Sequence, residues 1–188
     1  AILPFENKGA PEDAFYAYGI VADLISDVTG AGLIRVAGLK DVEKIDHTSL
    51  SYDEMSKVLL VRYVAQGTLW KLGSMFQLSL EIFDTQLSKV IYTKRWQTQW
   101  EELTTIKDDL SSNILETLKI EVDRKEEKSI SINPEAYEFY LKGKYTWEKT
   151  KSASDTEVAL GLLQKAVELD DKLIAANRTI GYIYWQSG

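Results

Sequence analysis

Hydrophobic positions in the first part of the chain recur with the spacing of a helix, between two short apolar runs. From Asp13 to Thr29 the apolar residues stand at steps of three and four, which predicts one face of an amphipathic helix that ends at a glycine. The residues of that face are Ala17, Val21, Leu24 and Val28. The runs Ile2–Phe5 and Leu33–Val36 predict buried strands on either side. A strand, a helix and a strand in this order favour a right-handed crossover with parallel pairing.

The middle of the chain changes to a period of two, which is the repeat of a half-buried strand. Met75–Asp84 alternates most cleanly, and the runs Arg62–Trp70 and Val90–Thr98 have the same β character. We expect Val90, Tyr92 and Trp96 to share one face of the last strand. Because the connections are short enough for hairpins, these runs predict an antiparallel meander.

Helices complete the predicted first domain. Residues 40–51 are polar and predict an irregular segment, and a short helix is expected over Asp53–Leu60. A longer helix is expected over Glu102–Leu118, with a buried apolar stripe on one face. The stripe consists of Leu103, Ile106, Leu110, Ile114 and Leu118. Residues 1–122 are therefore predicted to form an α/β (α+β) mixed-sheet domain with helices packed on it.

The last part of the chain predicts helices only. Residues 123–132 are charged and polar, which is typical of an exposed linker. Asn133-Pro134-Glu135 combines an N-cap, a proline and an acid at a helix start. Ser154–Glu157 forms a capping box for a second helix, and a third is expected from Lys172. The pattern breaks off at Gly188, so we expect the chain to be a piece of a longer protein.

The paired helices carry a repeat pattern. Ala159, Leu163 and Ala166 have the spacing of the packing residues in the second helix of a tetratricopeptide (TPR) repeat, which this segment resembles. Ile180-Gly181 followed by Tyr184 is similar to the Leu-Gly-x-x-Tyr signature of the next repeat's first helix. The resemblance implies that residues 133–188 are the beginning of an α-helical TPR array.

The first domain also resembles a known family, the TolB amino-terminal-like domain. The resemblance is carried by segments that stand in the family's order, namely residues 2–7, 18–25, 32–36, 61–67 and 78–84. That family joins its α/β domain to TPR repeats through an Asn-Pro-Glu-Ala-Tyr segment, present here at Asn133–Tyr137. In the family these modules follow bacterial adenylate or guanylate cyclase domains, or winged-helix regulators. The resemblance implies no catalytic residue, because the family's shared positions are structural.

Composition excludes several function classes. The net charge of −7 argues against nucleic-acid binding, because phosphate contacts depend on Lys and Arg. The absence of cysteine removes thiol catalysis, disulfides and cysteine-based zinc sites. The apolar runs are shorter than the roughly 18 residues of a membrane-spanning helix, so we expect no membrane insertion by this segment. Composition is compatible with both a cytoplasmic and a periplasmic location. It does not determine the oligomeric state.

The residues that could carry chemistry have structural explanations. His47 is the only histidine and lacks a nearby Asp/Ser constellation, so we expect it in a surface loop. The acidic pairs Asp53-Glu54 and Asp108-Asp109 lie on predicted helices, where adjacent side chains diverge. Gly30 and Gly32 follow a helix, whereas a dinucleotide-binding loop precedes one. We therefore predict no catalytic residue, no metal site and no cofactor.

Aromatic and cationic residues recur on the first helices of the predicted repeats, which line the concave groove of such arrays. The candidate partner-binding residues are Tyr140, Lys144, Trp147, Arg178, Tyr182 and Trp185. Such side chains suit an extended acidic or aromatic peptide. The alternative is that Trp147 and Trp185 pack against neighbouring repeats, and both interpretations stand.

These observations predict a non-catalytic interaction or scaffolding module of a larger bacterial signalling or regulatory protein, with a protein or peptide as its partner. The resemblance adds an association with a cyclase domain outside this segment. The alternative is a small-molecule-sensing domain that regulates an attached effector, with its ligand at the mouth of the mixed sheet. An enzyme is a third hypothesis, and no motif in the sequence supports it.

Overall fold

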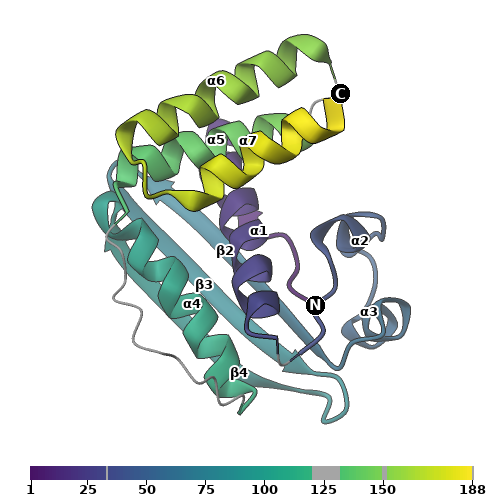
Figure 1. Ribbon diagram of the computed structural model, residues 1–188. Coiled ribbons are helices and arrows are strands. Elements are labelled where there is room, and N and C mark those ends of the chain that lie inside the picture. The colour runs from purple at the N-terminus through teal and green to yellow at the C-terminus, as the bar shows by residue number, and fades with distance from the viewer. Residues whose placement is uncertain (33, 120–131, 150–151, 188) are drawn as a thin grey trace. The chain divides into compact units, whose positions relative to one another are not determined.

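The computed structural model describes residues 1–32, 34–119, 132–149 and 152–187. The chain forms two compact units, Ala1–Asp123 and Arg124–Gly188 (Figure 1). Most of the predicted linker, residues 123–131, lies outside the described residues.

The first unit is built on a mixed β-sheet. Its strands lie in the order β1-β2-β3-β4 and span Glu6–Asn7, Tyr63–Leu72, Met75–Asp84 and Lys89–Gln99 respectively. Strand β1 runs parallel to β2, whereas β2, β3 and β4 form antiparallel pairs. The pairing confirms the predicted meander and the α/β (α+β) mixed-sheet class of this part of the chain.

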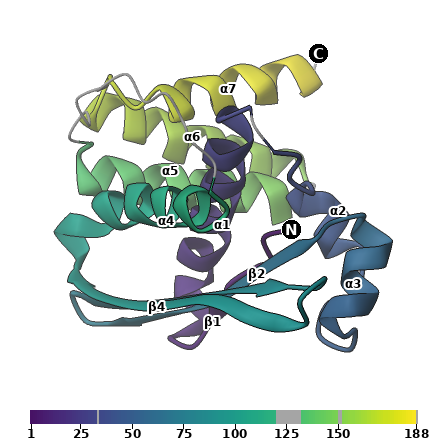
Figure 2. The same cartoon turned by 90° about the horizontal axis from the view of Figure 1, so that it is seen from below.

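Two long helices cover one face of this sheet. They are α1 (Ala14–Gly30) and α4 (Leu103–Thr117), which pack side by side and follow the short turns η1 (Pro11–Asp13) and η2 (Trp100–Glu102) (Figure 2). The side chains of β3 that face these helices are at most 1% exposed, and they are Phe76, Leu78, Leu80 and Ile82. Burying each of them contributes roughly 1.5–3 kcal/mol, so this alternating strand forms the centre of the core.

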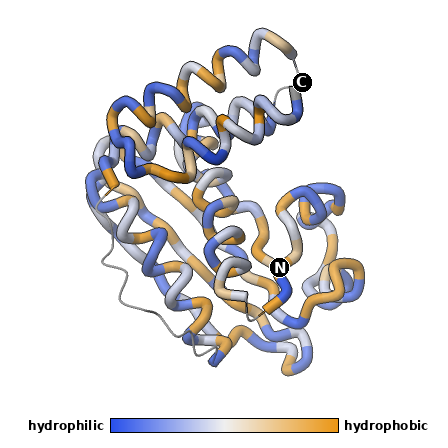
Figure 3. Tube along the Cα trace, viewed as in Figure 1, coloured by the Kyte–Doolittle hydropathy of each residue, from blue (hydrophilic) through white to orange (hydrophobic). Residues whose placement is uncertain are grey.

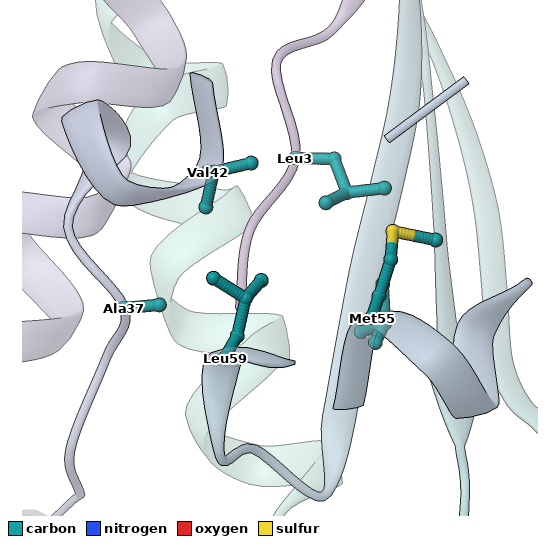
Figure 4. Close-up of a cluster of buried hydrophobic side chains, with 6 residues drawn as sticks. Leu3, Ala37, Val42, Met55 and Leu59 are labelled. Atoms are coloured by element: carbon teal, nitrogen blue, oxygen red, sulfur yellow. The ribbon is translucent and has the colours of Figure 1, made fainter. Parts of the chain in front are cut away.

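A smaller apolar cluster covers one end of the opposite face, beneath α2 (Leu39–Glu43) and α3 (Tyr52–Leu59). Its buried members are Leu3, Ala37, Val42, Met55, Leu59 and Val64 (Figure 4). The ring of Tyr52 also packs on Phe83, with 4.6 Å between the ring centroids. The segment 40–51 was predicted to be irregular, but it contains most of α2, because Val42 is buried in this cluster.

Both strands predicted near the start of the chain differ in the structure. Within Ile2–Phe5 there is a single parallel bridge, from Ile2 to Ala65, and the ladder continues as β1. The predicted strand Leu33–Val36 is wrong where it is described, since residues 34–36 belong to no strand. The neighbouring Ala37 packs with α2 and α3, so the chain turns towards those helices and β2 becomes the parallel partner.

A β-bulge in β4 overturns the common face predicted for Val90, Tyr92 and Trp96. Tyr92 pairs with Ile82 and, like Trp96, lies on the face that packs against the helices. The register shifts between Ile82 and Phe83, so Val90 pairs with Phe83 on the other face and is exposed. One extra residue in a strand reverses the facing of everything beyond it, because side chains alternate with a period of two.

The turn between β3 and β4 is organised by the buried carboxylate of Asp84. It accepts hydrogen bonds from Arg62 Nη2 at 2.7 Å and from the backbone N–H groups of Gln86 at 2.9 Å and Leu87 at 3.2 Å. The hydrogen bonds from the Arg62 side chain lower the pKa of Asp84, and the two backbone donors act in the same direction. The ionised carboxylate therefore stabilises the folded state.

The substitution Asp84→Asn is expected to lower the free energy of unfolding at pH 7 by about 1.5–3 kcal/mol, the range for hydrogen bonds to charged groups. Because the folded-state pKa lies below the unfolded value of about 3.9, this stabilisation is present above pH ~4 and is lost as the pH falls through the folded-state pKa. Urea denaturation at pH 7 and pH 3 should show a gap between variant and wild type that narrows in acid. Glu116→Gln, at an exposed carboxylate of α4, is the control and should change stability by less than ~0.5 kcal/mol. A gap that is independent of pH would contradict this role for Asp84.

In its described part, the second unit consists of α5 (Pro134–Lys149), α6 (Ala153–Leu169) and α7 (Ile174–Ser187), in which apolar and polar positions are interleaved (Figure 3). Helix α5 begins as predicted, since Asn133 Oδ1 accepts a hydrogen bond from the N–H of Glu135 at 2.9 Å. Helix α6 is capped by Ser152, whose Oγ accepts from the N–H of Asp155 at 3.1 Å. The capping box predicted at Ser154–Glu157 is therefore wrong, because the earlier serine also has an acid three residues ahead.

Helices α5 and α6 approach each other closely. The small and large residues that were predicted to pack in α6, Ala159, Leu163 and Ala166, are all fully buried. Gly143 of α5 lies directly against them, because a Cβ atom at this position would stand 2.8 Å from Leu163 Cγ. Helix α7 begins at Ile174 rather than at Lys172. The structure thus has packed C-terminal helices, and their assignment to TPR repeats remains a prediction.

Candidate partner-binding surface

The structure brings together three of the six predicted partner-binding residues. The ring of Trp147, near the end of α5, meets the ring of Tyr182 on α7 edge to face, with 5.3 Å between centroids. Tyr182 stacks on Trp185 of its own helix, with 5.9 Å between centroids. We call Trp147, Tyr182 and Trp185 the aromatic cluster. Trp185 is 77% exposed, and Tyr182 is also exposed, so the cluster presents aromatic faces on the surface of this unit.

Tyr140 and Lys144 lie earlier along α5. Tyr140 is only 1% exposed and is an interior residue, so it cannot contact a partner directly. Lys144 Nζ donates a hydrogen bond to the Tyr140 hydroxyl at 3.0 Å and also lies over its ring. Any contribution of Tyr140 to a binding surface would therefore be indirect, through the position of the Lys144 ammonium group.

Arg178 is the cation nearest in sequence to the exposed aromatics of α7. It is exposed, and its guanidinium makes no hydrogen bond or ion pair with any described residue. Positions 178, 182 and 185 follow the helical spacing, so Arg178 shares a face of α7 with Tyr182 and Trp185. Ile174, one turn before Arg178, is 72% exposed on the same stripe. Ile174 was not among the predicted residues, although it stands four residues before Arg178 and therefore on the same helix face.

This surface exists because α7 buries only one side. Ala176 and Ile183 are fully buried and seven residues apart, which places them on one stripe of the helix. The aromatic and cationic stripe lies on another face, where large apolar side chains remain in contact with solvent. Exposed aromatic groups beside an unpaired guanidinium are the composition of protein–protein hot spots.

The first unit contains a partly buried ion pair between α1 and α4. Lys107 Nζ lies 2.9 Å from Asp27 Oδ2. Burial raises the pKa of Asp27, although the charge of Lys107 opposes the shift. Burial alone would lower the pKa of Lys107, but the charge and hydrogen bond of Asp27 outweigh burial and raise it. The pair joins two packed helices, and we interpret it as structural.

Other kinds of site find little support in the part of the chain that the structure describes. There, no group of three or more His, Asp or Glu side chains is arranged to hold a metal ion. His47 is half-buried in the loop before α3 and has no carboxylate or hydroxyl partner among the described side chains. None of the described helices combines the length and apolar character that a membrane crossing requires.

Comparison with known proteins finds a distant homologue. The chain is 24% identical over 196 residues to "Putative adenylate cyclase 3" of Rhizobium meliloti (strain 1021). The match covers 97% of this chain but only 32% of the relative, so the chain spans about a third of that protein. No protein-family model matches the chain.

Two solved structures are similar at low sequence identity. The PelC L103M dodecamer from Paraburkholderia phytofirmans is 14% identical, with a TM-score of 0.45 over 64% of this chain and 86% of that one. Lipoprotein GNA1162 from Neisseria meningitidis is 12% identical, with a TM-score of 0.46 over 61% of this chain and 96% of that one. The resemblance to the TolB amino-terminal-like domain and to TPR repeats remains a prediction.

Proposed function

We propose that this chain is a non-catalytic interaction module of a larger bacterial signalling protein, and that the stripe on α7 together with Trp147 binds a peptide segment of a partner protein. The observation that carries the proposal is the exposed aromatic cluster beside Arg178, whose guanidinium has no hydrogen bond or ion pair with the residues that the structure describes. The homologue named as an adenylate cyclase supports an association with a cyclase, because this chain matches only a part of that longer protein. In this proposal no residue of the chain has a catalytic role.

The chemistry of the surface defines the peptide. Trp, Tyr and Arg dominate the binding energy of many interfaces, since they offer large apolar faces and several hydrogen-bond donors at low conformational cost. The rings of Tyr182 and Trp185 suit an aromatic or aliphatic side chain, and the guanidinium of Arg178 suits a carboxylate. We therefore expect peptides in which an acidic residue stands close to an aromatic or aliphatic one.

The test is selection of random peptides displayed on phage against the 188-residue chain, followed by affinity measurement by fluorescence polarisation. Enriched peptides should bind Trp185→Ala at least ~10-fold more weakly, which corresponds to a loss of about 1.4 kcal/mol. Arg178→Ala should weaken acidic peptides and reduce the salt dependence of their binding. Val158→Ala removes an exposed apolar side chain of α6 outside the surface and should leave affinity unchanged.

Circular dichroism of each variant separates lost binding from lost folding. The proposal fails if no peptide is enriched, or if enriched peptides bind the folded Trp185→Ala variant as tightly as wild type. In either case the aromatic cluster is better explained by packing against further helices.

A further inference from the structure

The first unit contains an apolar cavity with a volume of about 220 Å³. Aliphatic side chains from several separate parts of the chain form its walls. Among them are Val28 of α1, Ile34 and Val36 of the following segment, Val61 after α3, and Ile114 and Leu118 at the end of α4. An engineered apolar cavity of about 150 Å³ stays dry and binds benzene, so a cavity of this size and lining has room for a somewhat larger apolar group.

One side of the cavity carries positive charge. Both Arg35 and Arg62 line it, and their surroundings differ. Arg62 is occupied, because it forms an ion pair with Asp84 at 2.7 Å. Arg35 uses Nη1 to donate hydrogen bonds to the backbone carbonyls of Leu59 and Leu60, both at 3.1 Å, and it has no carboxylate partner among the described residues. Its Nε and Nη2 donors are left for an anion.

The backbone beside Arg35 is held in an uncommon conformation. Leu60 ends α3 with a φ of 54°, in the left-handed region, and lines the cavity. A leucine is rarely found there, because its Cβ crowds the backbone. The two hydrogen bonds from Arg35 to the carbonyls at this helix end offset part of that cost, since a cation is favourable at a helix C-terminus. Arg35 thus couples the cavity wall to the end of α3.

We propose that this cavity binds a small carboxylate with a medium-length aliphatic chain. The aliphatic chain lies between the walls formed by α1, β3 and the end of α4, and the carboxylate binds the free donors of Arg35. A neutral molecule of the same length would fill the apolar part of the cavity but would leave the guanidinium of Arg35 without a counter-charge. We therefore expect the cavity to bind the carboxylate more tightly than the neutral molecule. This site is in the first unit and is independent of the proposed peptide-binding surface on α7.

Binding would also connect segments that are distant in sequence. The ligand would contact the segment 34–36, the residues that follow α3, and the last turn of α4 at the same time. A ligand that binds only the folded arrangement stabilises all of these segments together. The cavity would therefore make the first unit a sensor of small carboxylates, with a readout at the end of α4.

The test is isothermal titration calorimetry of the 188-residue chain with octanoate, octanol and butanoate. Octanoate should bind at least ~10-fold more tightly than octanol, which lacks the charge, and than butanoate, which lacks most of the apolar chain. Hydrogen exchange should slow in the segments 34–36 and 114–118 when octanoate is present. Absence of octanoate binding to the folded chain, or equal affinity for octanol, would overturn the proposal.

Variants locate the site. Arg35→Gln keeps a donor for the carbonyls at the end of α3 but removes the charge, so it should abolish the preference for octanoate over octanol. Val36→Phe fills the cavity and should abolish binding of both, with thermal unfolding as the check that the variant is folded. If it does not fold, the Arg35→Gln result decides alone. Leu72→Ala, at an exposed apolar side chain that does not line this cavity, is the control. It should leave the affinity for octanoate unchanged, because octanoate is expected to bind in the cavity and not to exposed apolar side chains. Octanoate binding that survives Arg35→Gln unchanged would refute the assignment.

Discussion

Replacing Gly67 with alanine is expected to cost the first unit about 3 kcal/mol or more of its stability. A Cβ atom at this position of β2 would lie 2.4 Å from the carbonyl oxygen of Ser79 and 2.8 Å from the ring of Phe5. Ser79 belongs to the neighbouring strand β3, so the first clash is with backbone, which cannot move without opening the β2–β3 ladder. Domains are commonly stable by only ~5–15 kcal/mol, so a loss of this size removes a large share.

Hydrogen exchange followed by mass spectrometry measures this effect within the unit concerned. The amides of β2 and β3 should exchange much faster in Gly67→Ala than in wild type, and the thermal transition should move to lower temperature. Gly30→Ala is the matched control, because a Cβ at that position meets no atom within 4 Å. Equal protection of β2 and β3 in Gly67→Ala and Gly30→Ala would contradict the prediction, because it would mean that a Cβ atom at Gly67 fits without opening the ladder.

Gly143→Leu should have a comparable effect in the second unit, by separating α5 from α6. The first atom added at this position, Cβ, would already stand 2.8 Å from Leu163 Cγ and 3.0 Å from the carbonyl oxygen of Ala159. Neither atom is the free end of a flexible side chain, so the helices must move apart and the fully buried α6 residues become exposed. Overpacking of this kind costs about 1–3 kcal/mol for small additions, and we expect about 3 kcal/mol or more for a leucine.

The control is the same substitution at a glycine with free space. Gly161 lies in α6, and a Cβ there meets no atom within 4 Å. Gly161→Leu should stabilise the helix by roughly 0.5–1 kcal/mol, because glycine is a poor helix former. Thermal unfolding and hydrogen exchange in α5 and α6 should therefore move in opposite directions for the two leucine variants. A shift in the same direction would contradict the close approach at Gly143.

Local patterns predicted several elements well. The strand Met75–Asp84 has the predicted bounds, because strict alternation matches a strand whose two faces have different surroundings. The helix from Ala14 and the N-cap of α5 at Asn133 were also predicted closely, since helical periodicity and N-cap chemistry act within one or two turns. Even here local signals competed, because both Ser152 and Ser154 are followed by an acid three residues later, and the N-cap of α6 is Ser152.

Contacts between distant residues explain what the sequence did not predict. An apolar run such as 34–36 fits a strand or an extended loop equally well, and its packing towards α2 and α3 decided the outcome. The bulge that turns Val90 to the other face depends on pairing with β3, not on the sequence of β4 alone. The cavity beside Arg35 could not be found from spacing, because its walls come from segments scattered between the start of the chain and Leu118.

The candidate partner-binding surface was also predicted only in part from the sequence. Helical spacing alone placed Arg178, Tyr182 and Trp185 on one face of α7, because that relation is set within a single helix. Only the tertiary structure decided that Trp147 meets Tyr182 and that Tyr140 is buried, since both depend on how separate helices pack. The sequence by itself therefore determined the periodicity, the class of the fold and the residues shared by one helix face. The tertiary structure decided the strand partners, the facing beyond the bulge and the cavity, because these depend on contacts between residues far apart in the chain.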